Sequence, residues 1–290
     1  MLTDEKLAEL RGRAALMRWH IVDSMGPNKP HHFGGSLSAT DMVACLYFYK
    51  MRYNPADPKW PDRDLFVMSK GHSVPAQYVA LAMLGVFPME ELRTLKKLGS
   101  RLQGHPDMRK TPGIEAPTGS LGMGLSFANG LALAARLDKR PSHAYVLVGD
   151  GELDEGQIWE AAMTTAHYGL DNVTVLIDRN TLQGMGRTEE AKRLEDIAAK
   201  WQAFGWHTLK IDGHDLTQIC SALDQATEWT DKPTAIIART VKGKGVSFIE
   251  DRFNFHNSAL TPEQMAQAMS ELTALVERET GIKGYGGGAR

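Results

Sequence analysis

The sequence has little cysteine, no long hydrophobic run and no signal-peptide pattern in its first ten residues. Cys45 and Cys220 are its two cysteines, and an isolated pair makes neither a disulfide framework nor a metal-ligand spacing. The longest apolar runs, such as residues 144–148, are far too short to span a bilayer. Residues 1–10 lack the basic-then-apolar order of a signal peptide. We therefore expect a cytoplasmic protein that does not bind membranes.

An excess of charge of one sign is also missing. The chain has 33 Lys and Arg residues against 35 Asp and Glu residues, and no long basic run. This balance argues against an electrostatic nucleic-acid binder. Hydrophobic residues make up 42% and charged residues 23% of the 290 residues, which excludes disorder along the whole chain. Because no repeat or Pro/Gly/Ser-rich linker divides the sequence, we expect a single domain over residues 1–283 and a flexible glycine-rich tail over 284–290.

Short apolar runs alternate with helical stretches along the chain. Apolar residues between Leu7 and Ile21 recur every three or four positions, which predicts a helix that ends at Gly26-Pro27. Nearly continuous apolar runs predict strands at residues 65–68, 144–148, 173–177, 208–211 and 234–238. Further helices are expected at residues 38–50, 73–84, 122–137, 154–168, 189–204 and 215–228. The alternation predicts an α/β fold, with a parallel sheet and helices on both of its faces.

Two features of this pattern stand out. Residues 122–137 are apolar nearly all round, which predicts a fully buried helix. The segments 99–121 and 240–258 are too long for idle connections, and long loops of this kind usually carry function.

The sharpest motif follows the predicted strand at residues 144–148. Gly149-Asp150-Gly151 lies at the carboxyl end of this strand, where open α/β sheets bind ligands. Asn180 lies thirty residues on, after the next strand, so both side chains should reach neighbouring strand ends. A carboxylate and an amide oxygen suit Mg²⁺ or Ca²⁺. Because Mg²⁺ with few protein ligands usually completes its shell with phosphate, the spacing also predicts a diphosphate ligand.

These residues resemble the metal–diphosphate motif of thiamine diphosphate enzymes, and the run from Gly149 to Ala161 resembles the transketolase branch in particular. Four further segments are similar to transketolases in the family's order, and the resemblance spans about residues 10–260. These segments are His32–Ser38, Phe66–His72, Gly104–Pro106 with Pro117–Gly122, and Lys242–Gly245 with His256.

The resemblance implies a set of site residues. The metal, Mg²⁺ with Ca²⁺ or Mn²⁺ as alternatives, would be held by Asp150, Asn180 and the main-chain carbonyl of Leu182. The residues implied in binding thiamine diphosphate are His72, Gly119, Ser120, Leu121, Gly149, Asp150, Gly151, Glu152, Asn180, Lys242 and His256. The implied catalytic residues are His32, His72, His105 and His256, since imidazoles exchange protons near neutral pH and bond sugar hydroxyls.

Some assignments stay open at this point. His31-His32-Phe33 departs from the usual first histidine loop, so His31 is an alternative to His32. Lys242 and Lys244 are either phosphate contacts or solvated charges. Glu155 and Glu160 match acidic residues at the family's subunit interface. The remaining histidines are expected to have ordinary surface or capping roles: His20, His143, His167, His207 and His214.

The resemblance also implies what the chain lacks. A complete transketolase has a second domain, which binds the pyrimidine of the cofactor and supplies an activating glutamate. We therefore expect this chain to be the N-terminal subunit of a split transketolase. A C-terminal subunit would join it in a heterotetramer that transfers a two-carbon ketol unit from a ketose phosphate to an aldose phosphate. The alternatives are a diphosphate-binding subunit of a 2-oxo acid dehydrogenase or acyloin synthase, a non-catalytic scaffold or sensor, and a Mg²⁺-dependent phosphatase.

Overall fold

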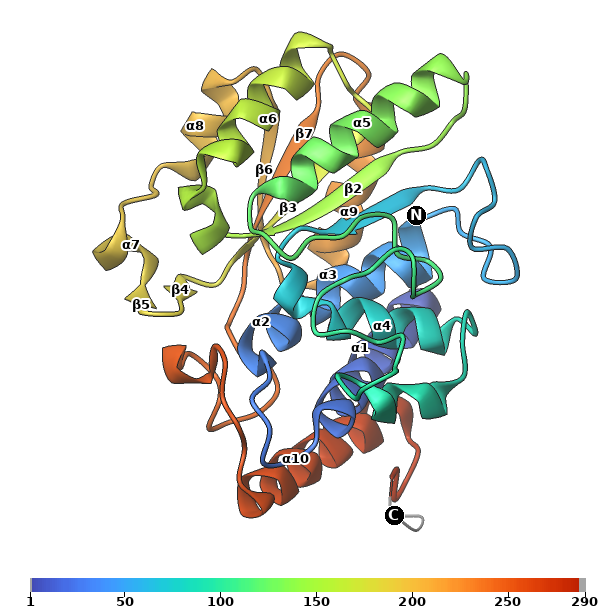
Figure 1. Ribbon diagram of the computed structural model, residues 1–290, viewed down its shortest axis with the longest axis vertical. Coiled ribbons are helices and arrows are strands. Elements are labelled where there is room, and N and C mark those ends of the chain that lie inside the picture. Colours follow the sequence, from blue (N-terminus) through green and yellow to red (C-terminus); the bar gives the residue numbers. More distant parts are fainter. Residues whose placement is uncertain (1, 287–290) are drawn as a thin grey trace.

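The computed structural model describes residues 2–286, so the last four residues of the predicted tail lie outside the described part of the chain. Its centre is a parallel sheet of five strands in the order β1-β2-β3-β7-β6 (Figure 1). The strands are β1 (Leu65–Met68), β2 (Ala144–Gly149), β3 (Val173–Arg179), β6 (His207–Asp212) and β7 (Thr234–Arg239). The α/β prediction is confirmed, and every strand of this sheet lies within two residues of its predicted bounds.

Alternate residues of the strands face two separate hydrophobic clusters. Phe66, Tyr145 and Leu147 belong to one cluster, whereas Val67 and Val146 belong to the other, because successive side chains of a strand point to opposite faces. The first face is covered by α1 (Asp4–Met25), α3 (Thr40–Cys45), α4 (Pro75–Met83), α9 (Leu216–Glu228) and α10 (Pro262–Thr280). The second is covered by α5 (Met123–Leu137), α6 (Gly156–His167) and α8 (Ile197–Ala203).

The remaining elements are short and surround the carboxyl edge of the sheet. They are α2 (Phe33–Ser38), α7 (Thr188–Ala191), the hairpin β4 (Leu182–Gln183) and β5 (Gly186–Arg187), and short 3-10 turns at Gly71–Ser73, Gly151–Asp154 and Phe253–Phe255. A further 3-10 turn lies at Met89–Thr94.

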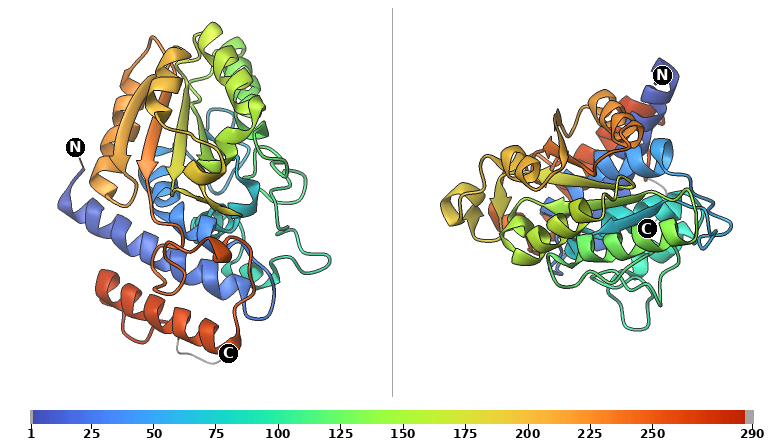
Figure 2. Two further views of the ribbon diagram at one scale, coloured as in Figure 1. Left: turned by 90° about the vertical axis from the view of Figure 1, so that its left-hand side faces the viewer. Right: turned by 90° about the horizontal axis from the view of Figure 1, so that it is seen from above.

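Helix α10 packs along α1, although the sequence pattern did not predict it (Figure 2). Thr261 caps α10 and forms a capping box with Gln264, and Pro262 occupies its first turn. Leu10 and Met17 of α1 share the larger core cluster with Leu272 of α10. The capping box was therefore a usable sequence signal for this helix.

Three helix predictions were wrong in detail. The helix expected at 189–204 is split into α7 and α8, and the side chain of Asp196 caps the start of α8. The helix expected at 38–50 divides at Ala39 into α2 and α3, and a π-helical turn, Leu46–Lys50, continues α3. The helix expected to be buried all round, α5, leaves Phe127 and Leu137 exposed.

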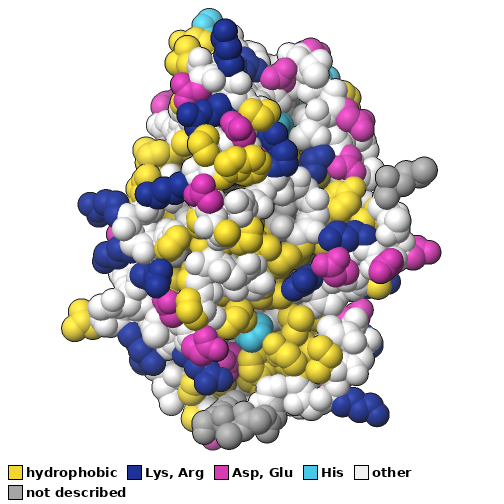
Figure 3. Space-filling view, turned by 90° about the vertical axis from the view of Figure 1, so that its right-hand side faces the viewer, with side chains coloured by type: hydrophobic (Ala, Val, Ile, Leu, Met, Phe, Trp, Pro, Cys, Tyr) yellow, Lys and Arg dark blue, Asp and Glu magenta, His cyan; other side chains and the backbone are white. Residues whose placement is uncertain are grey.

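The surface and the end of the described chain complete this picture. Hydrophobic side chains lie in several groups among charged ones on the face shown in Figure 3. Tyr285 is held by its neighbours, because its hydroxyl lies 2.7 Å from Nε2 of His20 and its ring packs edge-on against Trp19. Among residues 2–286, no helix is both long and apolar enough to cross a membrane.

Candidate active site

Asp150 and Asn180 lie side by side at the carboxyl edge of the sheet. They follow the neighbouring parallel strands β2 and β3, in which Gly149 pairs with Asp178. Both residues are buried. Backbone amides hold the Asp150 carboxylate, with Gly151 N 2.8 Å from Oδ1 and Thr181 N 2.6 Å from Oδ2. The one-step β-α-β spacing thus brings the two side chains to one edge.

The electrostatics of Asp150 fit a cation site. Burial, reinforced by the charge of Asp178, raises the pKa of Asp150 to about 6, although Arg179 opposes the shift from 3.2 Å. A bound divalent cation would lower this pKa, because it stabilises the ionised carboxylate. The donors at hand are the Asp150 carboxylate, the Asn180 amide oxygen and the Leu182 carbonyl, all hard oxygens of the kind Mg²⁺ takes.

No three His, Cys, Asp or Glu side chains within residues 2–286 gather into a metal-binding group. A metal at this edge must therefore use the amide and main-chain oxygens as well. Thr181 has a φ of 67°, and this left-handed residue begins the turn into Leu182. The Leu182 carbonyl accepts a hydrogen bond from Nζ of Lys242 at 2.8 Å and keeps a second lone pair free for a metal.

Lys242 joins the Asp150–Asn180 edge of the sheet to the histidines. Its side chain is buried, and Nζ lies 2.9 Å from Nδ1 of His256 as well as 2.8 Å from the Leu182 carbonyl oxygen. Burial lowers the pKa of Lys242 to about 8. Lys244, two residues on, instead lies near Glu250 at 3.5 Å, with its side chain exposed. The structure thus separates the two lysines that the sequence could not distinguish.

Three of the four predicted histidines form a compact cluster. The ring of His32 lies 4.7 Å from that of His72 and 5.5 Å from that of His256, and the last two rings are 5.1 Å apart. His105 is exposed at the rim of the cluster, 6.4 Å from His32. His31 lies apart: its ring faces Phe33 at 6.1 Å, and its backbone pairs with Ser258. The fold therefore brings His32, rather than His31, to the cluster.

The clustered imidazoles are neutral at pH 7. Burial lowers the pKa of His32 to about 4 and that of His256 to about 3, and nearby lysines and histidines add to both shifts. The pKa of His72 is also well below its usual value, mainly because of burial. Neutral imidazole both accepts and donates a hydrogen bond, so the cluster can bind hydroxyl groups.

The loop with Gly119, Ser120 and Leu121 lies next to this cluster. Gly119 and Ser120 are exposed and Leu121 is partly buried. Just before them, Thr118 Oγ1 donates to the Met68 carbonyl at 2.6 Å. A hollow of about 510 Å³ lies between Gly119 and the His105 loop. Both long loops predicted to carry function, 99–121 and 240–258, thus reach the same edge of the sheet.

Glu152 lies in the protein interior, whereas Glu155 and Glu160 lie at the surface. Glu152 is buried, and its carboxylate accepts hydrogen bonds from Ser69 Oγ and from the amides of Gly122 and Gly149. These contacts join the Gly-Asp-Gly loop to the 119–122 loop and leave Glu152 facing inward. Glu155 and Glu160 are exposed, as a role at an interface between subunits requires.

Sequence reasoning missed Lys70 and Lys96. Lys70 is buried, and its Nζ donates to the Gly35 carbonyl at 2.8 Å and to Asp178. The usable signal was a lysine placed two residues after a buried strand and two residues before His72. Lys96 lies near His32 and His105, and its charge contributes to lowering the pKa of both imidazoles. Nothing local in the sequence places Lys96 beside them.

Comparison with known proteins identifies one matching family and several similar proteins. A model of the family described as "Transketolase, thiamine diphosphate binding domain" matches residues 11–275. The chain is 46% identical over 268 residues to the 6-deoxy-6-sulfo-D-fructose transketolase subunit SqwG of Clostridium sp. (strain MSTE9), covering 92% of this chain and 98% of that protein. It is 43% identical to one of the subunits of the apulose-4-phosphate transketolase of Phocaeicola vulgatus, covering 90% of this chain and 92% of that one.

Solved structures agree with these matches. The transketolase of Pichia stipitis in complex with sedoheptulose-7-phosphate superimposes with a TM-score of 0.84 at 30% identity, covering 95% of this chain and 45% of that chain. The transketolase of Campylobacter jejuni gives a TM-score of 0.84 at 29% identity, covering 93% of this chain and 45% of that one. The chain thus spans less than half the length of these solved proteins, but nearly the whole length of the two relatives that are named as subunits.

Proposed function

The chain belongs to the family of transketolase thiamine diphosphate-binding domains and has the extent of one subunit of a two-chain transketolase; on this premise we propose that it provides the diphosphate, metal and proton-transfer half of the active site. This membership confirms the resemblance read from the sequence. The enzyme is a transferase, and we propose that it moves a two-carbon ketol unit from a ketose phosphate to an aldose phosphate.

One observation carries the proposal: Lys242 bridges the Asp150–Asn180 edge to the histidine cluster through the Leu182 carbonyl and His256. A cation site and a set of neutral imidazoles therefore share one buried lysine. That arrangement suits a ligand with a diphosphate at one end and a reacting carbon at the other. A scaffold, a sensor or a simple phosphatase has no use for both halves.

The proposed role of each residue follows from its chemistry. Asp150, Asn180 and the Leu182 carbonyl would hold Mg²⁺, and Lys242 would face the diphosphate oxygens. The exposed Gly119–Leu121 segment would meet the rest of the cofactor. When bound, thiamine diphosphate supplies the electron sink for breaking and forming a carbon–carbon bond beside a ketone.

The histidines would handle the sugar. His32, His72 and His256 are neutral and close enough for one hydroxyl group to contact two of them. They can therefore hydrogen-bond the donor and accept a proton as its carbon–carbon bond breaks. His105, at the exposed rim, would meet the substrate as it enters.

The two relatives are named as subunits, and on this basis we propose that a second polypeptide supplies the other half of the active site. We propose that this partner is a C-terminal transketolase subunit, and that two copies of each chain form a heterotetramer. Those relatives are named for a sulfo sugar and a sugar phosphate. We therefore propose a ketose with an anionic terminal group as the donor. A cytoplasmic location stays a prediction from the sequence.

The proposal is tested by calorimetry of thiamine diphosphate binding to the purified chain, with and without Mg²⁺. The titration is done on the chain alone and on its complex with the partner subunit. We expect Mg²⁺-dependent binding that Asp150→Ala abolishes and that Asp138→Ala, at an exposed site beyond α5, retains. Carbon dioxide release from a 2-oxo acid, without ketose–aldose exchange, would instead identify the alternative enzyme class.

A further inference from the structure

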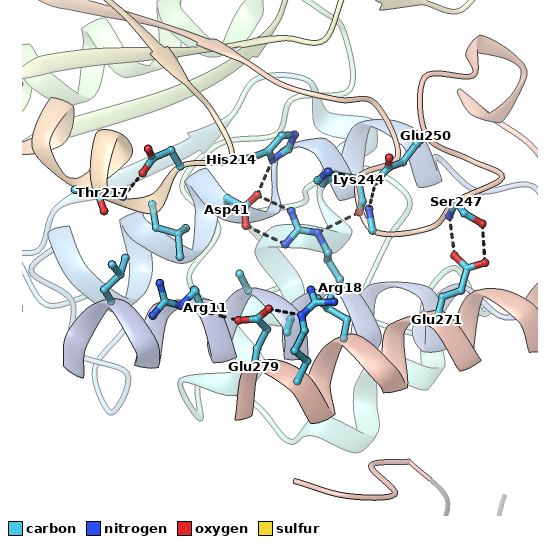
Figure 4. A pocket seen from close by; sticks show the side chains of 18 residues that line it. Arg11, Arg18, Asp41, His214, Thr217, Lys244, Ser247, Glu250, Glu271 and Glu279 are labelled. Atoms are coloured by element: carbon cyan, nitrogen blue, oxygen red, sulfur yellow. Dashed lines mark hydrogen bonds and ion pairs between the residues drawn. The ribbon is translucent and has the colours of Figure 1, made fainter. Parts of the chain in front are cut away.

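A second cavity lies behind the loop that carries Lys242. It has a volume of about 580 Å³ and lies between α1, α10, the start of α9 and residues 244–250 (Figure 4). Three polar residues from three elements meet at its wall: Arg18 of α1, Asp41 of α3 and His214 just before α9. The sequence alone predicts only an ordinary surface or capping role for His214 and indicates no role for Arg18 or Asp41.

These three side chains form one continuous hydrogen-bonded chain. The guanidinium of Arg18 donates to both oxygens of Asp41, at 2.9 and 2.6 Å. Oδ2 of Asp41 also lies 2.7 Å from Nδ1 of His214. Arg18 and Asp41 are each 5% exposed. A buried ion pair is costly to form, so its presence here calls for an explanation beyond stability.

Both ends of this hydrogen-bonded series of side chains bond to the backbone of the 241–244 segment. Nε2 of His214 accepts a hydrogen bond from the Val241 amide at 2.8 Å, and Nε of Arg18 donates to the Lys244 carbonyl at 3.1 Å. We name the three side chains the loop clamp. Between the two bonded positions lies Lys242, whose Nζ reaches the Leu182 carbonyl and His256.

The carboxylate of Asp41 determines which nitrogen of His214 carries the proton. Because Nε2 accepts from the Val241 amide, the proton must be on Nδ1, where it is donated to Asp41. Burial alone would raise the pKa of Asp41, but the charge of Arg18 and the hydrogen bond from His214 lower it to about 2. Asp41 is therefore a permanent anion, and it keeps His214 in the tautomer that can hold the loop.

Close packing also fits the loop to the clamp. Gly245 has a φ of 101°, and a Cβ there would lie 2.9 Å from Cδ of Arg18. Gly243 donates its amide to the Gly34 carbonyl at 3.0 Å. The segment is therefore held from the clamp side and from the side of α2, which begins next to His32.

We infer that Arg18, Asp41 and His214 are positioning residues that fix the 241–244 backbone and so place Lys242 at the diphosphate end of the site. The part of this inference that concerns the role of Lys242 rests on the proposed function. The clamp itself rests only on the contacts above. Within residues 2–286, none of the three clamp side chains bonds to a side chain predicted to touch the cofactor, the metal or the substrate.

The experiment compares His214→Gln with His214→Asn in the full chain. The Gln oxygen can take the place of Nε2 and accept from Val241, whereas the Asn amide nitrogen takes the place of Nδ1 and can only serve Asp41. Arg11→Ala is the matched control, since Arg11 lines the same cavity but bonds to no part of the loop. Arg18→Lys is a second test, because it keeps a charge beside Asp41 but removes the Nε donor to Lys244.

Two readouts separate the clamp from the function. Amide hydrogen exchange of the 240–245 segment, measured without cofactor, should rise about five- to tenfold in His214→Asn and stay within about twofold in His214→Gln and Arg11→Ala. In the complex with the partner subunit, the Kd for thiamine diphosphate with Mg²⁺ should rise about fivefold in His214→Asn and stay within about twofold in His214→Gln and Arg11→Ala. For Arg18→Lys we expect faster exchange at Lys244 and Gly245, with the unfolding temperature measured alongside.

Each contrary result has a distinct meaning. Equal exchange in the Asn, Gln and wild-type proteins would overturn the clamp. Faster exchange with an unchanged Kd would overturn the positioning role while leaving the clamp in place. If the wild-type complex binds no thiamine diphosphate, the proposed function fails and the positioning role fails with it, whereas the exchange result still decides the clamp.

Discussion

Lys70 and Asp178 form a fully buried ion pair that ties together four segments of the site. Lys70 follows β1, and Asp178 lies near the end of β3. Asp178 also accepts hydrogen bonds from Ser38, at the end of α2, and from Thr240, after β7. Burial would raise the pKa of Asp178, but the charge of Lys70 and these bonds keep it below its usual value. Each of these segments lies within a few residues of a predicted site residue.

Replacing Asp178 by Asn should destabilise the chain strongly. The change leaves the ammonium of Lys70 buried without its counter-charge, which costs about 3–5 kcal/mol of unfolding free energy. Urea unfolding of the isolated chain at pH 7 measures this. Asp138→Asn, which removes a carboxylate that is largely exposed beside Arg140, is the control and should change little. Similar unfolding midpoints for both variants would show that the buried pair contributes nothing.

Stability should fall as the pH drops below neutrality, because of the histidine cluster. The pKa of His32 is about 4 and that of His256 about 3 in the folded chain, below the value of about 6.5 in an unfolded one. Between the folded and unfolded pKa values, the unfolded state therefore binds more protons than the folded state. The contribution of these histidines to the free energy of unfolding is thus full above about pH 6.5 and is lost as the pH falls toward about 4. This histidine contribution is measured by comparing the pH dependence of the urea unfolding midpoint in the wild-type chain with that in His32→Gln and His256→Gln. If the variants show the same pH dependence as the wild type, the prediction is wrong.

Two glycines of α5 should respond to alanine in opposite directions. A Cβ on Gly124 would lie 2.4 Å from Cβ of Ser69, whereas a Cβ on Gly130 would meet no atom of residues 2–286 within 4 Å. We expect Gly124→Ala to cost about 1–3 kcal/mol through overpacking. Gly130→Ala should gain about 0.5–1 kcal/mol through the better helix propensity of alanine. Thermal unfolding of the two variants checks this, and a shift of the same sign in both would contradict it.

His105→Ala should impair turnover more than cofactor binding. His105 is exposed at the rim of the cluster and bonds to none of the groups expected to hold the diphosphate. We expect kcat of the reconstituted two-chain enzyme to fall about a hundredfold, with the Kd for thiamine diphosphate within about twofold. His207→Ala, at the start of β6 beside Asp231, is the control. Equal losses in kcat and Kd for His105→Ala would point to a structural role.

The strand pattern and the loop motifs could be predicted because they depend on nearby residues. One β-α-β step places Asp150 beside Asn180, and the short apolar runs alone identify all five strands of the sheet. The partner of a buried polar side chain has no such local signal. Lys70 finds Asp178 from 108 positions away, and Val241 reaches His214 across 27. These contacts depend on the finished packing.

Helix errors have a similar physical cause. The split between α7 and α8 is decided by Asp196, which caps the start of α8 rather than continuing the helix before it. Residues with capping side chains favour helix starts as much as turns, so only the tertiary structure selects between them. In α5, composition indicated burial on all sides, but Phe127 and Leu137 remain exposed. Apolar character does not specify which neighbour covers a helix.

The pairing of α1 with α10 also governs how the chain folds during synthesis. The ribosome completes residues 4–25 long before residues 262–280 emerge, so Leu10 and Met17 have no cover from α10 for most of translation. Contacts between such distant segments slow folding, because the long loop between them must close first. Until then the apolar stripe of α1 is available to chaperones and to other unfinished chains. Helix α10 is therefore a control point for the yield of folded protein.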